Sequence, residues 1–180
     1  MTSKKINFLK FAILIGLLVI VLVNITYFAI KENKNVSESN ATIVNVTQLK
    51  PITLRDSVVN FATGLLDTPY VEGGCSKNGF DCSGFVYFVF QHFKIQVPRS
   101  SSQFEHFGKE IPIESVKKGD ILLFLSPTSN VIGHVGIVTN PKGKESDFIH
   151  STSGREMKVV ITSLKKEGYA RGFVKAVRVF

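Results

Sequence analysis

The chain has 180 residues, enough for one ordinary domain and a short additional segment, and its 44% hydrophobic content with fifteen phenylalanines can form a compact core. The formal net charge is +8 at pH 7, but the lysines occur singly and in pairs, without the basic stripe and interleaved aromatic residues of a nucleic-acid-binding surface. We therefore expect no nucleic-acid partner. A solvated basic surface explains the charge most simply, and an anionic matrix such as a cell wall or a membrane would also suit it.

An uncharged apolar run at residues 11–30 predicts one transmembrane helix. Its length matches the roughly 20 residues that a helix needs to cross a bilayer. Three lysines lie within residues 1–10, so this segment is expected to stay in the cytoplasm while the rest of the chain is exported. A cleaved signal peptide is the alternative, but its apolar core would be shorter and would end at small residues. We expect an uncleaved single-pass anchor in the cell membrane, with the rest facing the periplasm or cell wall.

The segment after the apolar run, residues 31–52, is polar and rich in Asn, Ser, Thr and Lys, which predicts a flexible linker. Residues 53–180 are then long enough for one domain. Apolar positions at helical spacing predict a helix over 54–66, with Thr53 as its N-cap. A second helix is predicted over 82–93, and its apolar residues cover most of its surface, so it should be buried.

The C-terminal part of the chain changes from helical to strand patterns. Asp81 is placed to cap the second helix, and a short helical turn is expected near 101–107. Strands are predicted from their β-branched and aromatic residues, with turn sequences between them, at 120–124, 134–139, 147–151 and 172–179. Helices followed by strands predict an α+β domain in which N-terminal helices pack on an antiparallel sheet.

Cys82, at the first position of the second predicted helix, is the candidate nucleophile. A cysteine thiolate is the reactive form, and the positive end of a helix dipole favours it. Taken alone, a buried structural cysteine is the commoner finding. The small neighbours Ser83 and Gly84 favour a catalytic role, because they allow a substrate to approach and leave N–H groups free to stabilise an oxyanion.

Two histidines on later strands complete the candidate site. A hairpin centred on Lys142 would place His134 directly opposite His150 on one face, so that one imidazole could orient the other. An error of one residue in register would put them on opposite faces. Val135 and Ile137 should face the core, which leaves His134 on the other face. His92 and His106 lack such a context and are expected at the surface.

The second cysteine, Cys75, is expected to be a free loop thiol. A disulfide to Cys82 is sterically possible across the short intervening loop, but it would consume the proposed nucleophile. A zinc site is excluded by ligand count, because no pair of cysteines or histidines has the usual spacing. The sequence therefore predicts neither a metal nor a cofactor.

Several segments resemble, in the same order, the NlpC/P60 family of cell-wall cysteine peptidases. They are Thr68–Gly74, Phe80–Phe85, Val97–Ser100, Lys118–Ile121, Gly133–Ile137 and Phe148–His150. The resemblance covers about residues 54–180. It implies a papain-like α+β fold and hydrolysis of peptide bonds in peptidoglycan stem peptides or their cross-links.

The resemblance also implies roles for individual residues. Cys82 would be the nucleophile, His134 the base and His150 its orienting partner. Tyr70 stands where the family places a tyrosine beside the oxyanion site. Asp81 and Ser83 stand where some members contact the substrate.

These observations together predict an exported, membrane-tethered cysteine endopeptidase that acts on peptidoglycan. An amide hydrolase or acyltransferase with another acyl substrate is one alternative, and a non-catalytic wall-binding module is another. The intact cysteine and two histidines argue against the wall-binding module. The sequence leaves open which peptidoglycan bond is cleaved and whether the protein forms oligomers.

Overall fold

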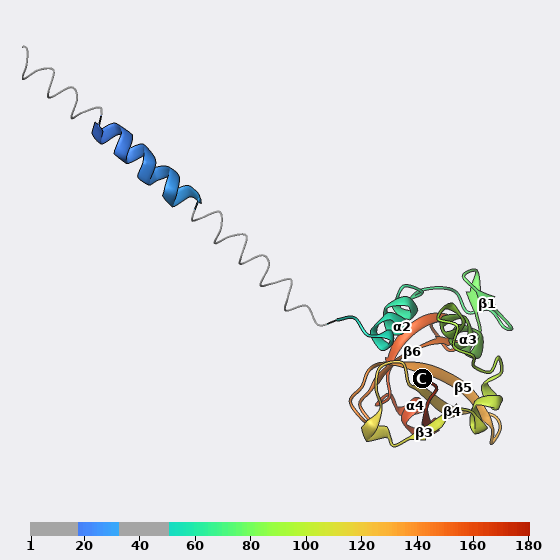
Figure 1. Ribbon diagram of the computed structural model, residues 1–180. Helices are drawn as coiled ribbons and strands as arrows, with labels where there is room; N and C mark the ends of the chain where they lie inside the picture. The colour runs from blue at the N-terminus through green and yellow to red at the C-terminus, as the bar shows by residue number, and fades with distance from the viewer. Residues whose placement is uncertain (1–17, 33–50) are drawn as a thin grey trace, which may run out of the picture. The chain divides into compact units, whose positions relative to one another are not determined.

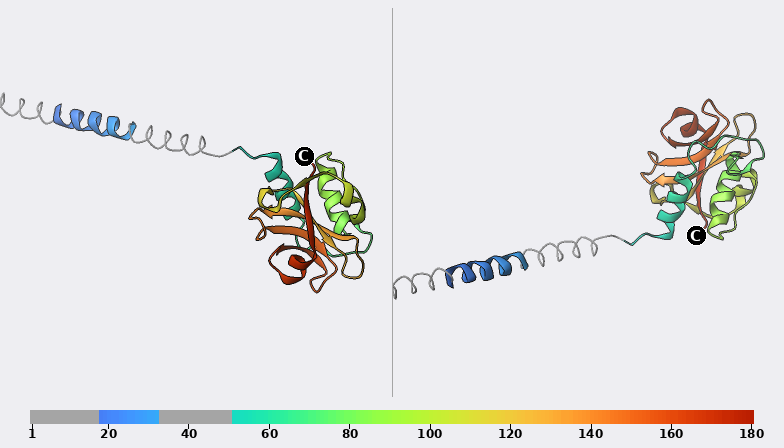
Figure 2. Two further views of the ribbon diagram at one scale, coloured as in Figure 1. Left: turned by 90° about the horizontal axis from the view of Figure 1, so that it is seen from below. Right: turned by 90° about the horizontal axis from the view of Figure 1, so that it is seen from above.

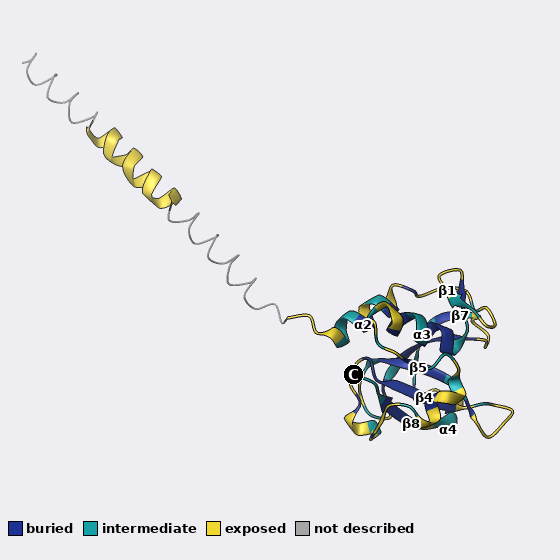
Figure 3. Ribbon diagram, turned by 45° about the vertical axis from the view of Figure 1, so that its right-hand side comes forward, coloured by how far each residue is buried: buried dark blue, intermediate teal, exposed yellow. Residues whose placement is uncertain are grey.

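The computed structural model describes residues 18–32 and 51–180, in two units that divide at Pro51 (Figure 1). The described part of the first unit is a single helix, residues 18–32, whose side chains are exposed along its whole length (Figure 3). No helix within the two described ranges is both long and apolar enough to cross a membrane. The expected cytoplasmic segment 1–10, the start of the expected membrane helix and most of the expected linker lie outside the described residues.

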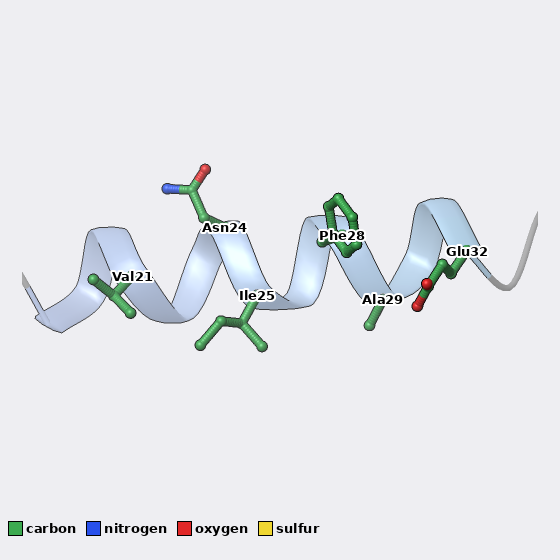
Figure 4. A pocket seen from close by; sticks show the side chains of 6 residues that line it. All are labelled: Val21, Asn24, Ile25, Phe28, Ala29 and Glu32. Carbon is green, nitrogen blue, oxygen red and sulfur yellow. The ribbon is translucent and has the colours of Figure 1, made fainter.

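The apolar helix 18–32 satisfies its internal polar side chains on its own backbone. Asn24 Nδ2 donates to the carbonyl of Ile20 at 2.7 Å, and Thr26 Oγ1 lies 2.9 Å from the carbonyl of Val23. Figure 4 shows the six side chains that line a shallow surface along this helix: Val21, Asn24, Ile25, Phe28, Ala29 and Glu32. Polar groups that bond within their own helix are compatible with an apolar environment.

The second unit contains one six-stranded antiparallel sheet with the strand order β3-β8-β4-β5-β6-β7. Its strands are β3 (Lys109–Ile111), β4 (Ile121–Leu125), β5 (Ile132–Asn140), β6 (Asp147–Thr152), β7 (Lys158–Ser163) and β8 (Phe173–Arg178). A separate two-stranded hairpin joins β1 (Cys75–Ser76) to β2 (Gly79–Phe80). The four predicted strands are confirmed as β4, β5, β6 and β8, whereas β7 and the short strands were not predicted.

Both predicted helices are present, and both are capped as expected. The helices are α2 (Leu54–Thr63), α3 (Cys82–His92) and α4 (Glu167–Gly172), with 3-10 turns η1 (Ser101–His106) and η2 (Ile113–Ser115). Thr53 and Asp56 form a reciprocal capping box at α2. Asp81 accepts the backbone N–H of Gly84 at 2.6 Å and caps α3. The α2 helix ends at Thr63, three residues earlier than predicted.

Two apolar layers cover the two faces of the sheet, because side chains alternate between the faces along each strand. Helices α2 and α3 pack on one face against Ile121, Leu123, Val135 and Ile137. On the opposite face Leu122, Phe124 and Phe148 pack with Tyr169 of α4. Figures 1 and 2 show α2 and α3 on one side of the sheet and α4 on the other. The N-terminal helices therefore pack on an antiparallel sheet, as predicted.

A fully buried carboxylate, Asp120, joins α2 to the start of β4, an inner strand of the sheet. It accepts hydrogen bonds from Arg178 at 2.6 and 2.9 Å, from Arg55 at 3.1 Å and from the backbone N–H of Lys117 at 2.8 Å. Arg55 also donates to the main-chain oxygen of Phe180 at 2.6 Å, and its guanidinium lies 4.6 Å from the centre of that ring. Two cations and one backbone donor thus satisfy this single buried anion.

We expect Asp120→Asn to lower the free energy of unfolding by about 2–4 kcal/mol, because it removes the buried charge that both arginines share. Denaturant titration of the full chain, followed by circular dichroism, measures the change. Asp67→Asn is the matched control, since Asp67 is exposed and its one ion pair within residues 18–32 and 51–180 is with Lys158. We expect that control to change stability by less than about 0.5 kcal/mol. Equal losses in the two variants would show that the Asp120 cluster is not a stabilising centre.

Candidate functional site

Cys82 is the first residue of α3, and its sulfur lies beside the start of strand β5. The thiol donates to the carbonyl of Gly133 at 3.7 Å, and the backbone N–H of Val135 points at the sulfur. These two groups flank His134 in the chain. The nucleophile predicted from the sequence is therefore held against the strand that carries the predicted base.

The loop before α3 packs directly on the start of this helix, next to Cys82. An added Cβ at Gly84 would overlap the carbonyl oxygen of Gly74, so only glycine lets the loop approach this closely. The carbonyl of Gly74 also accepts the N–H of Asp81 at 3.0 Å. The backbone on both sides of the cysteine is fixed by these contacts.

The structure brings His134 and His150 into direct contact. His134 Nε2 lies 2.9 Å from His150 Nδ1, and the two rings are almost perpendicular. His150 Nε2 lies 3.0 Å from Thr162 Oγ1, on the neighbouring strand β7. The three side chains form one hydrogen-bonded row across β5, β6 and β7, and His150 is completely buried within it.

The expected register of this hairpin is wrong by two residues. Ile137 pairs with Ile149, so His150 lies opposite Gly136 rather than opposite His134. The turn explains the shift: Gly143 adopts a left-handed conformation with φ 57°, and the register is irregular between Val138 and Asn140. A shift of two residues keeps both histidines on one face. An added Cβ at Gly136 would lie 2.5 Å from Phe148 Cδ2 and 3.2 Å from His150 Cβ, so this glycine lets both side chains of β6 pack against β5.

Burial keeps both imidazoles neutral. It lowers the pKa of His134 to about 4, although part of this residue reaches solvent, and the pKa of His150 to about 2, where the neighbouring His134 adds to the effect. At neutral pH only one proton is then shared between the two facing nitrogens. Val135 and Ile137 face the core, as predicted, and His134 lies on the opposite face.

Burial and a neighbouring carboxylate act on the thiol of Cys82 at the start of α3. Burial raises the pKa of its thiol, and the negative charge of Asp81 raises it further. Backbone N–H groups of Ser83, Cys82 and Val135 oppose the rise without cancelling it. Desolvation and the adjacent carboxylate therefore act against the helix dipole, which by itself favours the thiolate.

A polar cluster of Asp81, Ser83 and Arg99 flanks the cysteine at the start of α3. Arg99 donates to Asp81 at 2.7 and 3.0 Å, to Ser83 Oγ at 3.1 Å and to the carbonyl of Gly73 at 2.9 Å. Hydrogen bonding to Asp81 raises the pKa of the Arg99 guanidinium. Asp81 and Ser83 thus lie beside Cys82, and both accept hydrogen bonds from Arg99. The sequence did not indicate this role of Arg99.

Tyr70 lies within electrostatic range of Cys82, and its place beside an oxyanion site stays a prediction. Burial raises the pKa of its phenol, and Cys82 in its ionised form and Asp81 raise it further. The hydroxyl therefore stays protonated at neutral pH and can donate a hydrogen bond. Ser153 is its polar neighbour.

Aromatic rings enclose the histidine pair on the side away from α3. Tyr169 lies 5.1 Å from the centre of the His150 ring and 5.9 Å from that of His134, while Phe124 and Phe148 close the remaining sides. This enclosure explains the low pKa of both imidazoles. Tyr169 and Thr162 were not identified from the sequence, because α4 and β7 bring them to the site from outside the recognised segments.

The other titratable candidates have no part in this row. Cys75 is a free, half-buried thiol in β1, and burial raises its pKa. His92 and His106 are exposed, as predicted, and His92 stacks on Phe61. Among the described residues, no group of three or more His, Cys, Asp or Glu side chains is arranged to hold a metal ion.

Comparison with known proteins places this domain among its relatives. A probable endopeptidase of Haemophilus influenzae is 36% identical over 114 residues, which cover 62% of this chain and 66% of that protein. Murein DD-endopeptidase MepH of Escherichia coli is 38% identical over 116 residues, which cover 62% of this chain and 41% of that protein. The matched region thus covers less than two thirds of the length of each of these two relatives.

Solved structures show the same fold. An NlpC/P60 family protein from Bacillus cereus matches with a TM-score of 0.63 and 30% identity, over 72% of this chain and 41% of that one. The NlpC/P60 domain of the peptidoglycan hydrolase SagA matches with a TM-score of 0.57 and 28% identity, over 70% and 99% of the two chains. The sequence profile of the NlpC/P60 family matches residues 67–178. With this match over more than half of its length, the chain belongs to the NlpC/P60 family.

Proposed function

We propose that this protein is a cysteine endopeptidase that hydrolyses peptide bonds of peptidoglycan through Cys82, His134 and His150. The observation that carries the proposal is the buried row of His134, His150 and Thr162 beside a cysteine at a helix start. Relatives named as endopeptidases and as a murein DD-endopeptidase support the class of substrate.

The row of hydrogen bonds has one arrangement of protons that makes His134 a base. If His150 Nε2–H donates to Thr162 Oγ1, His150 Nδ1 accepts from His134 Nε2–H. The remaining nitrogen of His134, Nδ1, then carries a lone pair that can accept the thiol proton. Thr162 acts as a positioning residue, because its hydroxyl can accept the His150 Nε2–H and thereby support this tautomer.

Nucleophilic attack begins when the thiol turns from the Gly133 carbonyl towards His134. The proton passes to Nδ1 as the sulfur bonds to the substrate carbonyl carbon, so charge separates only as the substrate is attacked. Backbone N–H groups at the start of α3 and the phenol of Tyr70 stabilise the oxyanion. His134 returns the proton to the leaving amine, and water then hydrolyses the thioester.

Two other functions are compatible with the same residues. An acyltransferase would pass the thioester to an amine or alcohol instead of water, and a wall-binding module would bind without turnover. Products distinguish the three, since only hydrolysis gives fragments that gain one water for each bond broken.

We expect the full chain, purified in detergent, to release peptide fragments from isolated peptidoglycan, and Cys82→Ala to release none. Mass spectrometry of the soluble fraction identifies the products. The substitution removes the nucleophile and little core volume, so the unfolding free energy should change by no more than about 1 kcal/mol. Release of the same fragments by a folded Cys82→Ala variant would exclude the proposed mechanism.

We expect substitutions in the row of His134, His150 and Thr162 to lower activity less, the further the residue lies from the thiol. His134→Ala should lower kcat/KM by about 10³–10⁴, His150→Ala by about 10–100 and Thr162→Val by a few fold, because each group further from the thiol only positions the next. Thr162→Ser keeps the hydroxyl and should restore the lost activity. A larger loss in His150→Ala than in His134→Ala would mean that their roles are exchanged.

We also propose that the apolar segment 11–30 anchors the enzyme in the membrane, with the domain on the outer side. Two observations support this proposal. The run is uncharged and follows three lysines, and the polar side chains Asn24 and Thr26 bond to carbonyl groups of their own helix. An exported position matches the substrate, since peptidoglycan lies outside the cell membrane.

Protease added to spheroplasts should digest the domain, and the intact protein should stay in the membrane fraction after carbonate extraction. Extraction as a shortened form that begins after about residue 30 would identify the segment as a cleaved signal peptide. The catalytic proposal does not depend on that outcome.

A further inference from the structure

A pocket of about 360 Å³ adjoins His134 and Gly133 at the start of β5. The end of β4, the turn after β6 and α4 form its walls. Its lining includes His134, Phe124, Thr152, Ser153, Lys166 and Tyr169, but not Cys82. The volume falls within the roughly 300–1,000 Å³ of sites for small ligands.

The position of the pocket relates it to one side of the cleaved bond. His134 must return its proton to the amine that leaves, so that amine lies close to this imidazole. A pocket that shares His134 and excludes Cys82 is therefore placed to receive the residue on the amine side of the bond. The polar cluster of Asp81, Ser83 and Arg99 lies instead at the cysteine.

The lining of the pocket has the chemistry of a site for an anion on an apolar stem. Lys166 supplies a cation, and none of the lining residues is acidic. Lys166 forms an ion pair with Glu156, but the distance from Nζ to the carboxylate oxygen is long, at 3.7 Å. The ammonium can therefore also pair with a second anion. The Phe124 and Tyr169 rings provide apolar walls, and Lys166 Nζ lies 5.9 Å from the centre of the Tyr169 ring.

We propose that this pocket binds the amino-acid residue that leaves with the amine, and that Lys166 pairs with a carboxylate on that residue. The enzyme would thus prefer substrates whose leaving residue carries a free carboxylate over those in which it is amidated. This inference rests on the proposed function and names a specificity-determining residue for it.

The test compares two forms of one peptide, L-alanyl-γ-D-glutamyl-L-lysine with a free C-terminal carboxylate and the same peptide with a C-terminal carboxamide. We expect the full chain to cleave the free form with a kcat/KM about five to ten times higher, mainly through KM. Lys166→Gln should lower that ratio to about one, and Lys166→Glu should favour the amide. A ratio that is unchanged in Lys166→Gln would overturn the proposal.

Lys165→Gln is the matched control. Lys165 is the adjacent exposed lysine, it pairs with Glu145 at 2.8 Å, and it does not line the pocket. This variant loses the same charge from the same segment, and we expect it to keep the wild-type ratio. An equal effect of both substitutions would show that the preference arises from net charge and not from the pocket.

Binding separates the subsite from the activity. Isothermal titration of the full-length Cys82→Ala variant with both peptides should give about fivefold tighter binding of the free carboxylate, and adding Lys166→Gln should abolish that difference. Equal affinities in Cys82→Ala would reject the subsite even if the wild type hydrolyses both peptides. Binding with the expected difference, together with no hydrolysis by the wild type, would reject the proposed activity and retain the subsite.

Discussion

Desolvation of the histidine pair is the constraint on which the candidate site depends. The aromatic side chains of β4, β6 and α4 exclude water from His150 and cover part of His134, so the facing nitrogens of the two rings bond to each other and the inner nitrogen of His150 bonds to Thr162. This requirement holds three neighbouring strands in one register. It also keeps the imidazoles neutral, which a base must be before it accepts a proton.

The same physics governs the nucleophile. Cys82 begins a helix, which alone would favour a thiolate, but it is also buried and adjacent to Asp81. We therefore interpret the resting site as a neutral thiol beside a neutral imidazole. Charge appears only during attack, when the oxyanion donors can stabilise it. The Asp81–Arg99 pair flanks the cysteine, whereas Lys166 lines the pocket beside His134.

Local patterns in the sequence predicted the parts of the fold that depend on local interactions. Helices α2 and α3 begin where Thr53 and Asp81 cap them, and alternation at Val135 and Ile137 identified the core face of β5. The hairpin register was missed by two residues, because a left-handed Gly143 and a bulge are not visible as a pattern. His134 and His150 are in contact, and Cys82 lies beside Gly133, the residue before His134. Thr162, Lys166 and Tyr169 could not be inferred, since only the tertiary fold brings them there.

The pH dependence of Cys82 alkylation tests the central claim most directly. With Cys75→Ser as the background, the rate of reaction with iodoacetamide should still rise above pH 8 and reach half of its maximum at a higher pH than a free cysteine peptide, because burial and Asp81 raise the thiol pKa. The acid limb of kcat/KM should in contrast lie near pH 4, since His134 loses its base function only when protonated. An alkylation rate that is constant between about pH 5 and pH 8 would reveal a preformed thiolate–imidazolium pair and contradict the account.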